Sequence, residues 1–222
     1  DALPIYLAQR IGGVDLYNEV CSGDKNFTED AYVQAGEEIK ALAKKGFING
    51  CMSVDATTAE ALFAAGKGAI LITGSWSIPT FTEDPERAKD FSYFPFPVAE
   101  GGKEDEAGYL YGGVANTLAI SRSTKNKDAV VKFLKYMMSE EEQTLSVERT
   151  GTFSTVKVSP KEENMDPLAY QFSQYVSDGV EGFIPYTDQA LPPEQAENLL
   201  NALTAIVAED NADVKAELAK IK

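Results

Sequence analysis

One short run of apolar residues constrains the fold of this chain more than any other feature. Residues 69–73 read Ala-Ile-Leu-Ile-Thr, with no charged interruption and with the length of a strand. Such a run is typical of a strand that is buried on both faces, as in a sheet covered by helices. A helical pattern over 57–65 precedes it, and Gly66 follows that pattern as a stop signal. The sequence therefore predicts an α/β fold.

Helical and strand-like segments alternate along the rest of the chain. Residues 28–45 carry acids in the first turn, lysines in the last turn, and apolar side chains three and four residues apart, which predicts a helix. Further helices are predicted at 125–138, 139–149, 166–177, 193–208 and 212–221. Further strands are predicted at 4–8, 91–94 and 118–120.

The composition excludes several classes of function. Asp and Glu number 35 against 20 Lys and Arg, so the net charge is −15, and the chain lacks the positive surface that nucleic acid or an anionic membrane attracts. It contains no histidine, which removes His-ligated zinc and His-dependent nucleophiles from this chain. We expect no cofactor and no nucleic-acid partner.

Neither cysteines nor acids form a convincing metal site. Cys21 and Cys51 are too few for zinc, and we favour two free thiols, with a disulfide as the alternative outside the cytoplasm. The oxygen-bearing residues within 24–30 imitate a calcium loop but lack its glycine and terminal glutamate. The acids at 140–142 are most simply the first turn of a helix, where they complement the helix dipole.

Three stretches carry motifs whose order and spacing match one known family. Residues 60–76 read EALFAAGKGAILITGSW, which is similar to a helix, F-x-x-G-K-x-A-M, strand and G-x-W block. Residues 109–138 contain Tyr-Leu-Tyr-Gly-Gly and then a predicted strand and helix. Residues 120–134 read ISRSTKNKDAVVKFL, which is similar to the pattern I-x-x-x-S-K-N-K-x-A-x-x-F-L. Residues 149–154 are similar to a return segment, although its usual proline is missing. The chain resembles the extracellular solute-binding proteins (family 1) of ABC sugar importers, the maltose-binding-protein-like group.

The resemblance implies a periplasmic-binding-protein-like (type II) fold with two α/β lobes. It assigns residues 1–111 and 156–222 to the C-terminal lobe, and residues 112–155 to the crossover and a segment of the N-terminal lobe. The rest of the N-terminal lobe of the same protein would be missing, and the apolar face of the 125–138 helix would lack its cover. The chain starts at Asp1 without Met, so we expect a removed targeting segment or a piece of a longer protein.

The resemblance also implies a function. The protein would capture a mono- or oligosaccharide between its lobes by hinge closure and deliver it to the transmembrane subunits of an ABC permease. It would not be an enzyme, and it would lie outside the cytoplasm, in a periplasm or as a lipoprotein at the cell surface. A carbohydrate-active hydrolase with a carboxylate pair is the alternative, although 35 acids make such pairs uninformative. A purely structural or adhesive domain is the third possibility.

Trp76 is the first candidate for contact with a sugar. It is the only tryptophan and follows the 69–73 run directly. A flat indole can stack on the apolar face of a pyranose ring, with Ser75 beside it and Gly74 allowing close approach. The alternative is an aromatic residue of the core or of a domain interface.

Tyr109 and Tyr111 are the second candidates. They could line a cleft and hydrogen-bond sugar hydroxyls, with Gly112 and Gly113 as the hinge. The alternative is a cross-strand aromatic pair beside a bulge.

Two more groups complete the predicted site. Gln9 and Arg10 follow the predicted 4–8 strand at its carboxyl end, where open α/β sheets bind ligands, although a solvated loop is the alternative. The resemblance places Tyr186, Asp188 and Gln189 near the segment from which relatives contribute sugar contacts.

Overall fold

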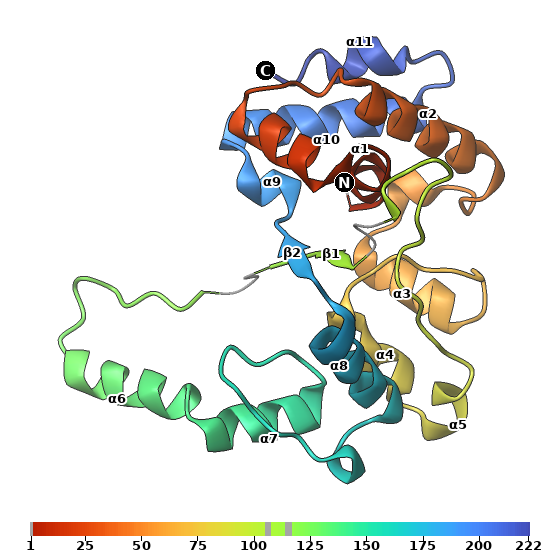
Figure 1. Cartoon of the computed structure of the whole chain (residues 1–222). Coiled ribbons are helices and arrows are strands. Elements are labelled where there is room, and N and C mark those ends of the chain that lie inside the picture. Colours follow the sequence, from red (N-terminus) through yellow and green to blue (C-terminus); the bar gives the residue numbers. More distant parts are fainter. Residues whose placement is uncertain (1, 105–107, 114–116) are drawn as a thin grey trace. The chain divides into compact units, whose positions relative to one another are not determined.

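The structure, a computed structural model, describes residues 2–104, 108–113 and 117–222 (Figure 1). The chain forms two compact units, each built from separate stretches of sequence. Unit 1 comprises Asp1–Asp55, Pro95–Ala115 and Val180–Lys222, and unit 2 comprises Ala56–Phe94 and Asn116–Gly179.

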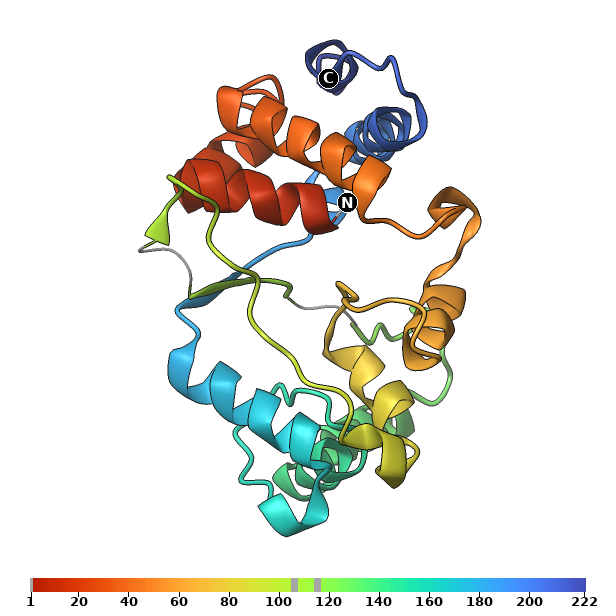
Figure 2. The ribbon, with the colours of Figure 1, turned by 90° about the vertical axis from the view of Figure 1, so that its right-hand side faces the viewer.

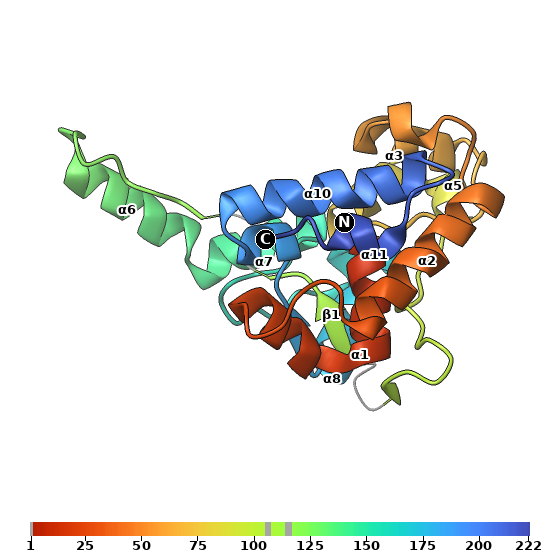
Figure 3. The same cartoon turned by 90° about the horizontal axis from the view of Figure 1, so that it is seen from above.

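Unit 1 is mainly helical. Its helices are α1 (Ala2–Ser22), α2 (Asp30–Lys45), α9 (Thr187–Ala190), α10 (Pro193–Ala208) and α11 (Val214–Leu218), with a 3₁₀ turn, η1 (Cys51–Ser53). Helix α2 packs against α1, α10 and α11, and Figures 2 and 3 show α1 and α2 side by side and α10 beside α2. The predicted 28–45 helix is confirmed as α2.

The core of unit 1 lies between these helices. Apolar side chains from α1 and α10 are fully buried there, among them Ile5, Tyr17, Leu199 and Ile206. Gly36 of α2 allows a close approach, because an added Cβ would lie 2.4 Å from Cγ1 of Val214 on α11. This close contact lets α2 and α11, which are far apart in the sequence, share one apolar core.

The predicted strand at residues 4–8 is wrong, because these residues open helix α1. Ile5 and Ala8 are three residues apart and both are buried, so the run belongs to one helix face. A short apolar run cannot distinguish a buried helix from a strand by periodicity alone. Pro4 stands in the first turn, which tolerates proline, and the helix breaks at Gly13, whose φ is 91°.

Within the residues that the structure describes, the sheet of unit 1 is one parallel pair of strands. Strand β1 (Tyr109–Tyr111) pairs with β2 (Gly182–Ile184), with Tyr109 opposite Gly182 and Tyr111 opposite Ile184. The N–H of Gly112 continues the ladder by donating to the carbonyl of Ile184 at 2.8 Å. The pair brings two segments that are far apart in the sequence into register.

The predicted strands at 69–73, 91–94 and 118–120 are also wrong in this structure. Among the residues that the structure describes, none of these runs pairs with another strand. Ile70 is 67% exposed and Leu118 is 65% exposed, which a strand buried on both faces would not be. These apolar segments therefore lack, within the described residues, the neighbouring strands and helices that would bury them.

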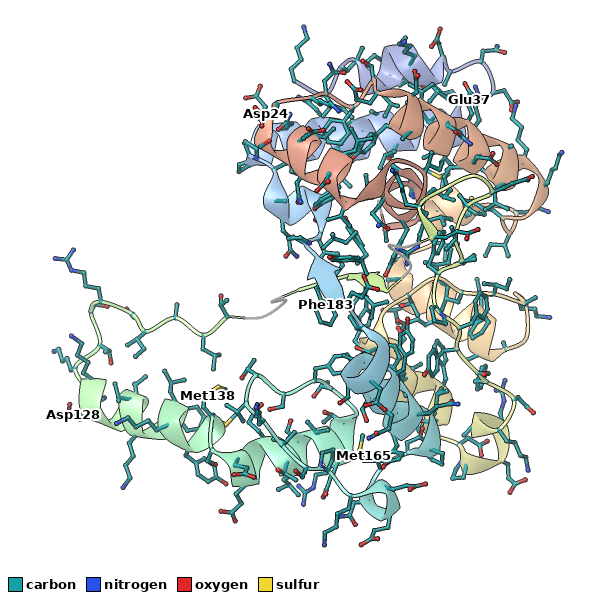
Figure 4. The ribbon with its side chains drawn as sticks, viewed as in Figure 1. Asp24, Glu37, Asp128, Met138, Met165 and Phe183 are labelled. Atoms are coloured by element: carbon teal, nitrogen blue, oxygen red, sulfur yellow. The ribbon has the colours of Figure 1, made fainter. Side chains whose placement is uncertain are left out.

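Unit 2 contains shorter helices and a smaller core. Its helices are α3 (Ala56–Ala64), α4 (Ile78–Thr82), α5 (Pro85–Ala88), α6 (Lys127–Met137), α7 (Glu140–Thr150) and α8 (Pro167–Gly179), with 3₁₀ turns η2 (Ser75–Ser77) and η4 (Glu162–Asn164). Its buried apolar cluster consists of Ile78, Val147, Met165 and Ala169, and Figure 4 labels Met165 beside α8.

Helices α6 and α7 follow each other in sequence but differ in how they are supported. Ser139 caps α7 by accepting from the N–H of Glu142 at 3.3 Å, and Glu140 and Glu141 share the first turn, as predicted. Helix α6 has no buried residue, and Figures 1 and 3 show it reaching out from α7. Its apolar face is uncovered within the part of the chain described, as expected.

Cys21 and Cys51 are free thiols in the structure, which agrees with the prediction of two free thiols. Across residues 2–104, 108–113 and 117–222, no helix combines the length and apolar character that crossing a bilayer requires.

Adjacent leucines of α10 provide a test of the unit 1 core. Leu199 is 0% exposed, so Leu199→Ala should lower the free energy of unfolding of unit 1 by about 2–5 kcal/mol. Leu200, its exposed neighbour, is the matched control, and Leu200→Ala should change it by about 0.5 kcal/mol or less. Urea unfolding followed by far-ultraviolet circular dichroism measures both changes. Equal effects would contradict the placement of α10.

Candidate functional site

The predicted site residues fall into two groups, one in each unit. Gly74, Ser75 and Trp76 lie in unit 2, where the chain enters η2 before α4. Residues of the other predicted groups lie in unit 1, namely Gln9, Arg10, Tyr109, Tyr111, Gly112, Gly113, Tyr186, Asp188 and Gln189.

The Trp76 turn is exposed at its tip and anchored at its base. The Trp76 side chain is 58% exposed, whereas Ser77, the next residue, is 1% exposed. The N–H of Ser77 donates to the carbonyl of Gly74 at 3.1 Å and closes the turn. A large aromatic side chain is therefore presented to solvent on a fixed backbone, which suits a stacking surface better than a core position.

The neighbour of Gly74 in the structure is the indole of Trp76. An added Cβ would lie 2.1 Å from Cζ3 of Trp76 and 2.4 Å from Cε3, so the indole itself occupies the space that the missing side chain leaves. A side chain at position 74 would have to displace the ring. The indole thus packs against Gly74, and the role of this glycine in the approach of a ligand stays a prediction.

Arg10 and Gln9 are interior residues of unit 1. Arg10 is 0% exposed and Gln9 is 1% exposed, both within α1. Nη1 of Arg10 donates to Oε1 of Gln9 at 2.6 Å, and Nη2 donates to the carbonyl of Tyr109 at 3.0 Å. The guanidinium also lies 5.4 Å from the ring centroid of Tyr6. Arg10 therefore connects α1 to the start of β1.

The backbone of Arg10 makes the same connection. Its carbonyl accepts from the N–H of Lys103 at 2.8 Å, and an added Cβ on Gly102 would lie 2.1 Å from that oxygen. The side chain of Arg10 thus holds Tyr109, and its backbone holds Lys103. The predicted strand before Gln9 and Arg10 is wrong, because both residues lie in α1. Arg10 supports β1 by its hydrogen bond to the carbonyl of Tyr109, and Gln9 accepts from Arg10.

Tyr111 links the ends of β1 and β2. Its hydroxyl donates to Oγ1 of Thr187 at 3.0 Å and accepts from the N–H of Thr187 at 2.6 Å. Its ring meets that of Tyr186 edge-on, with the centroids 5.0 Å apart. Its own N–H donates to the hydroxyl of Tyr6 at 2.5 Å. Residues predicted separately are thus brought together where the two strands end.

Two tyrosines of this group, Tyr111 and Tyr186, have a raised pKa. Burial raises the pKa of the Tyr111 hydroxyl above its ordinary value, and the hydrogen bonds with Thr187 only partly oppose this. Burial, with the nearby carboxylate of Asp188, also raises the pKa of Tyr186. At neutral pH both therefore remain protonated hydroxyl groups, and the Tyr111 hydroxyl donates its one proton to Thr187.

The two glycines after β1 differ in their surroundings. An added Cβ on Gly112 would meet only ordinary contacts, with Phe183 at 3.7 Å and the hydroxyl of Tyr186 at 3.8 Å, and one on Gly113 would meet nothing within 4 Å. Figure 4 labels Phe183 on β2. Neither glycine is required by local crowding, so their role as a hinge stays a prediction.

Sequence reasoning missed three supporting residues. Thr187 is fully buried and bonds to Tyr111, and Ser77 and Glu60 hold the Trp76 turn. No motif marked them, because a single hydroxyl or carboxylate has no pattern of its own. The available signal was position in the sequence, since Ser77 directly follows Trp76 and Thr187 directly follows Tyr186.

Comparison with known proteins identifies the family. The sequence profile of the bacterial extracellular solute-binding proteins matches residues 5–144, which is well over half of the chain. The chain belongs to this family. The resemblance inferred from the three motifs is therefore confirmed.

Several relatives of this solute-binding protein are known. The maltotriose-binding protein of Pyrococcus abyssi (strain GE5 / Orsay) is 31% identical over 132 residues, which cover 56% of this chain and 27% of that protein. A solved chitin oligosaccharide binding protein is 25% identical, with a TM-score of 0.84, over 99% of this chain and 54% of that one.

A third relative supports the fold. A structure from work on xylan utilization by the thermophilic bacterium Caldanaerobius polysaccharolyticus has a TM-score of 0.88 and 24% identity, covering 100% of this chain and 58% of that chain. The predicted α/β lobe of the periplasmic-binding-protein type is confirmed by these likenesses. The chain spans only about half the length of the solved structures it matches.

Proposed function

We propose that this chain is part of the substrate-binding component of an ABC importer, which captures a carbohydrate and delivers it to a membrane permease. Family membership supports a binding role, and relatives named for maltotriose and chitin oligosaccharide support a sugar. The observation that carries the proposal is Trp76, 58% exposed on an anchored turn. An exposed, fixed indole suits the apolar face of a sugar ring.

The proposed protein has two lobes. Residues 1–111 and 156–222 would belong to the C-terminal lobe, and residues 112–155 would form the crossover and a segment of the N-terminal lobe. The rest of the N-terminal lobe would come from further polypeptide. Because the chain covers 58% and 54% of two solved relatives, further sequence is needed to build a molecule of their size. The uncovered face of α6 and the unpaired run at 69–73 support this proposal.

The proposed mechanism is hinge closure without a covalent step. A sugar that contacts both lobes stabilises the closed state by its extra contacts in that state. The segments of β1 and β2, with Gly112 and Gly113, would form the hinge. Tyr109, Tyr111, Tyr186 and Asp188 would contribute polar contacts to the sugar, and Trp76 with Ser75 the stacking surface. The protein would act outside the cytoplasm, free in a periplasm or lipid-anchored.

The hydrolase alternative is not supported. The relatives that carry a functional name are binding proteins, the maltotriose-binding and chitin oligosaccharide binding proteins. We therefore propose that the sugar is released chemically unchanged.

Calorimetry with three neutral sugars tests the proposal. Maltotriose, chitotriose and xylotriose are titrated into the 222-residue chain and into a longer protein that contains it. The longer protein should bind at least one sugar with micromolar Kd, and the chain alone should bind only weakly, since it holds part of the contacts. Micromolar binding by the chain alone would contradict the two-lobe proposal, and newly formed reducing ends would contradict simple binding.

A further inference from the structure

The turn that carries Trp76 is anchored by hydrogen bonds among hydroxyl and carboxylate groups of unit 2. The buried Ser77 hydroxyl donates to Oε1 of Glu60 on α3 at 2.5 Å, and it lies 2.7 Å from Oγ1 of Thr73. A serine hydroxyl has one proton to donate. That proton goes to the carboxylate of Glu60, so the Thr73 hydroxyl must be the donor to the Ser77 hydroxyl. The hydrogen bonds therefore run from Thr73 to Ser77 to Glu60.

The indole is held from its other side by Gly74. The ring atoms Cζ3, Cε3 and Cη2 of Trp76 would lie within 2.1–2.4 Å of a Cβ at position 74. The six-membered part of the indole therefore rests on the backbone of Gly74. One part of the ring is covered in this way while 58% of the side chain stays exposed.

Helix α3, which supplies Glu60, is itself fixed against the segment after the turn. Phe63 lies one turn further along α3 and meets Phe81 of α4 with ring centroids 5.2 Å apart. Phe91 completes this cluster at 5.5 Å from Phe63 and 5.3 Å from Phe81. The carboxylate of Glu60 is thus presented to Ser77 from a packed element.

From these contacts we infer that Glu60 and Ser77 are positioning residues for Trp76, which fix the indole before any sugar arrives. The inference rests on the proposed function, and neither residue needs to touch the sugar. A ring that is already ordered loses less side-chain freedom on binding, an advantage of about 2- to 10-fold in affinity.

The fluorescence of Trp76 tests the positioning without any sugar, because it is the only tryptophan in the chain. Ser77→Ala and Glu60→Leu should lower the anisotropy of the indole and raise its quenching by acrylamide about twofold. Glu60→Gln, which keeps an acceptor oxygen, should restore the behaviour of the unchanged chain. Unchanged anisotropy in both disruptive variants, with circular dichroism preserved, would overturn the inference.

Matched controls separate positioning from general loosening. Ser92→Ala and Glu83→Leu make the same chemical changes at exposed positions of unit 2 and should leave the indole signal unaltered. If a disruptive variant unfolds, Thr73→Val removes only the outer hydroxyl and should still loosen the ring. A loss of anisotropy equal in the controls and in Ser77→Ala would contradict the inference.

Calorimetry on the longer protein distinguishes the two proposals. Ser77→Ala should weaken sugar binding about 2- to 10-fold, and Glu60→Gln should leave it nearly unchanged. If the unchanged protein binds no sugar while the indole loosens in Ser77→Ala, the proposed function fails and the positioning of the ring stands. If sugar binds and Ser77→Ala alters neither affinity nor anisotropy, the positioning inference fails alone.

Discussion

Replacing Trp76 by alanine is expected to weaken sugar binding by the longer protein about 30-fold or more, because a central aromatic contact typically accounts for about 2 kcal/mol. The side chain is 58% exposed, so its removal should leave the free energy of unfolding nearly unchanged. Trp76→Phe, which keeps a smaller flat ring, should bind with intermediate affinity. Titration calorimetry measures all three affinities.

The control for this prediction is a change of exposed apolar surface elsewhere. Leu200→Ala shortens an exposed side chain on α10 and should leave the affinity as it is. An affinity of Trp76→Ala within twofold of the unchanged protein would show that the indole is not a stacking surface. Trp76 would then be an ordinary exposed aromatic residue.

Replacing Arg10 by methionine is expected to lower the free energy of unfolding of unit 1 by about 2–5 kcal/mol. Methionine keeps much of the apolar stem but donates no hydrogen bond. The carbonyl of Tyr109 and Oε1 of Gln9 would lose the donors they have at 3.0 Å and 2.6 Å. Urea unfolding followed by circular dichroism measures the change.

Arg87 is the matched control for Arg10. It is exposed in α5 of unit 2, and Arg87→Met should change the free energy of unfolding by about 0.5 kcal/mol or less. If Arg10→Met were equally mild, the guanidinium would not be a support of β1.

Local patterns predicted the helices well. The segments at 28–45, 57–65 and 193–208 are helical in the structure within one or two residues of each predicted end. Their signals lie inside the segment, in periodic apolar positions and end residues. The exception is 4–8, where a run of five residues was too short to show a helical period, although it continues into a helix.

Strands were predicted poorly because pairing is not local. Residues 69–73 have the composition of a strand, yet no partner for them lies within the described residues. Tyr109–Tyr111 pairs with Gly182–Ile184, and neither segment contains a strong strand signal. A segment becomes a strand when a neighbour satisfies its backbone, and that neighbour can be far away in the sequence.

The candidate site was predictable where it rests on one local turn. Trp76 could be singled out because a lone tryptophan follows an apolar run and a glycine. The roles of Arg10 and Gln9 could not, since their burial depends on Tyr109, about a hundred residues later. The partnership of Tyr111 with Thr187 depends in the same way on the pairing of β1 with β2.

The net charge of −15 and the exposed apolar side chains of unit 2 have opposite effects on the self-association of the chain. At an ionic strength of about 0.1 M, repulsion reaches across a Debye length of about 10 Å and helps to keep the molecules apart. At about 1 M that length shrinks to about 3 Å, and salts such as sulfate also strengthen apolar association. Precipitation with ammonium sulfate should therefore remove the isolated 222-residue chain earlier than a two-lobed protein that covers Ile70, Leu118 and α6.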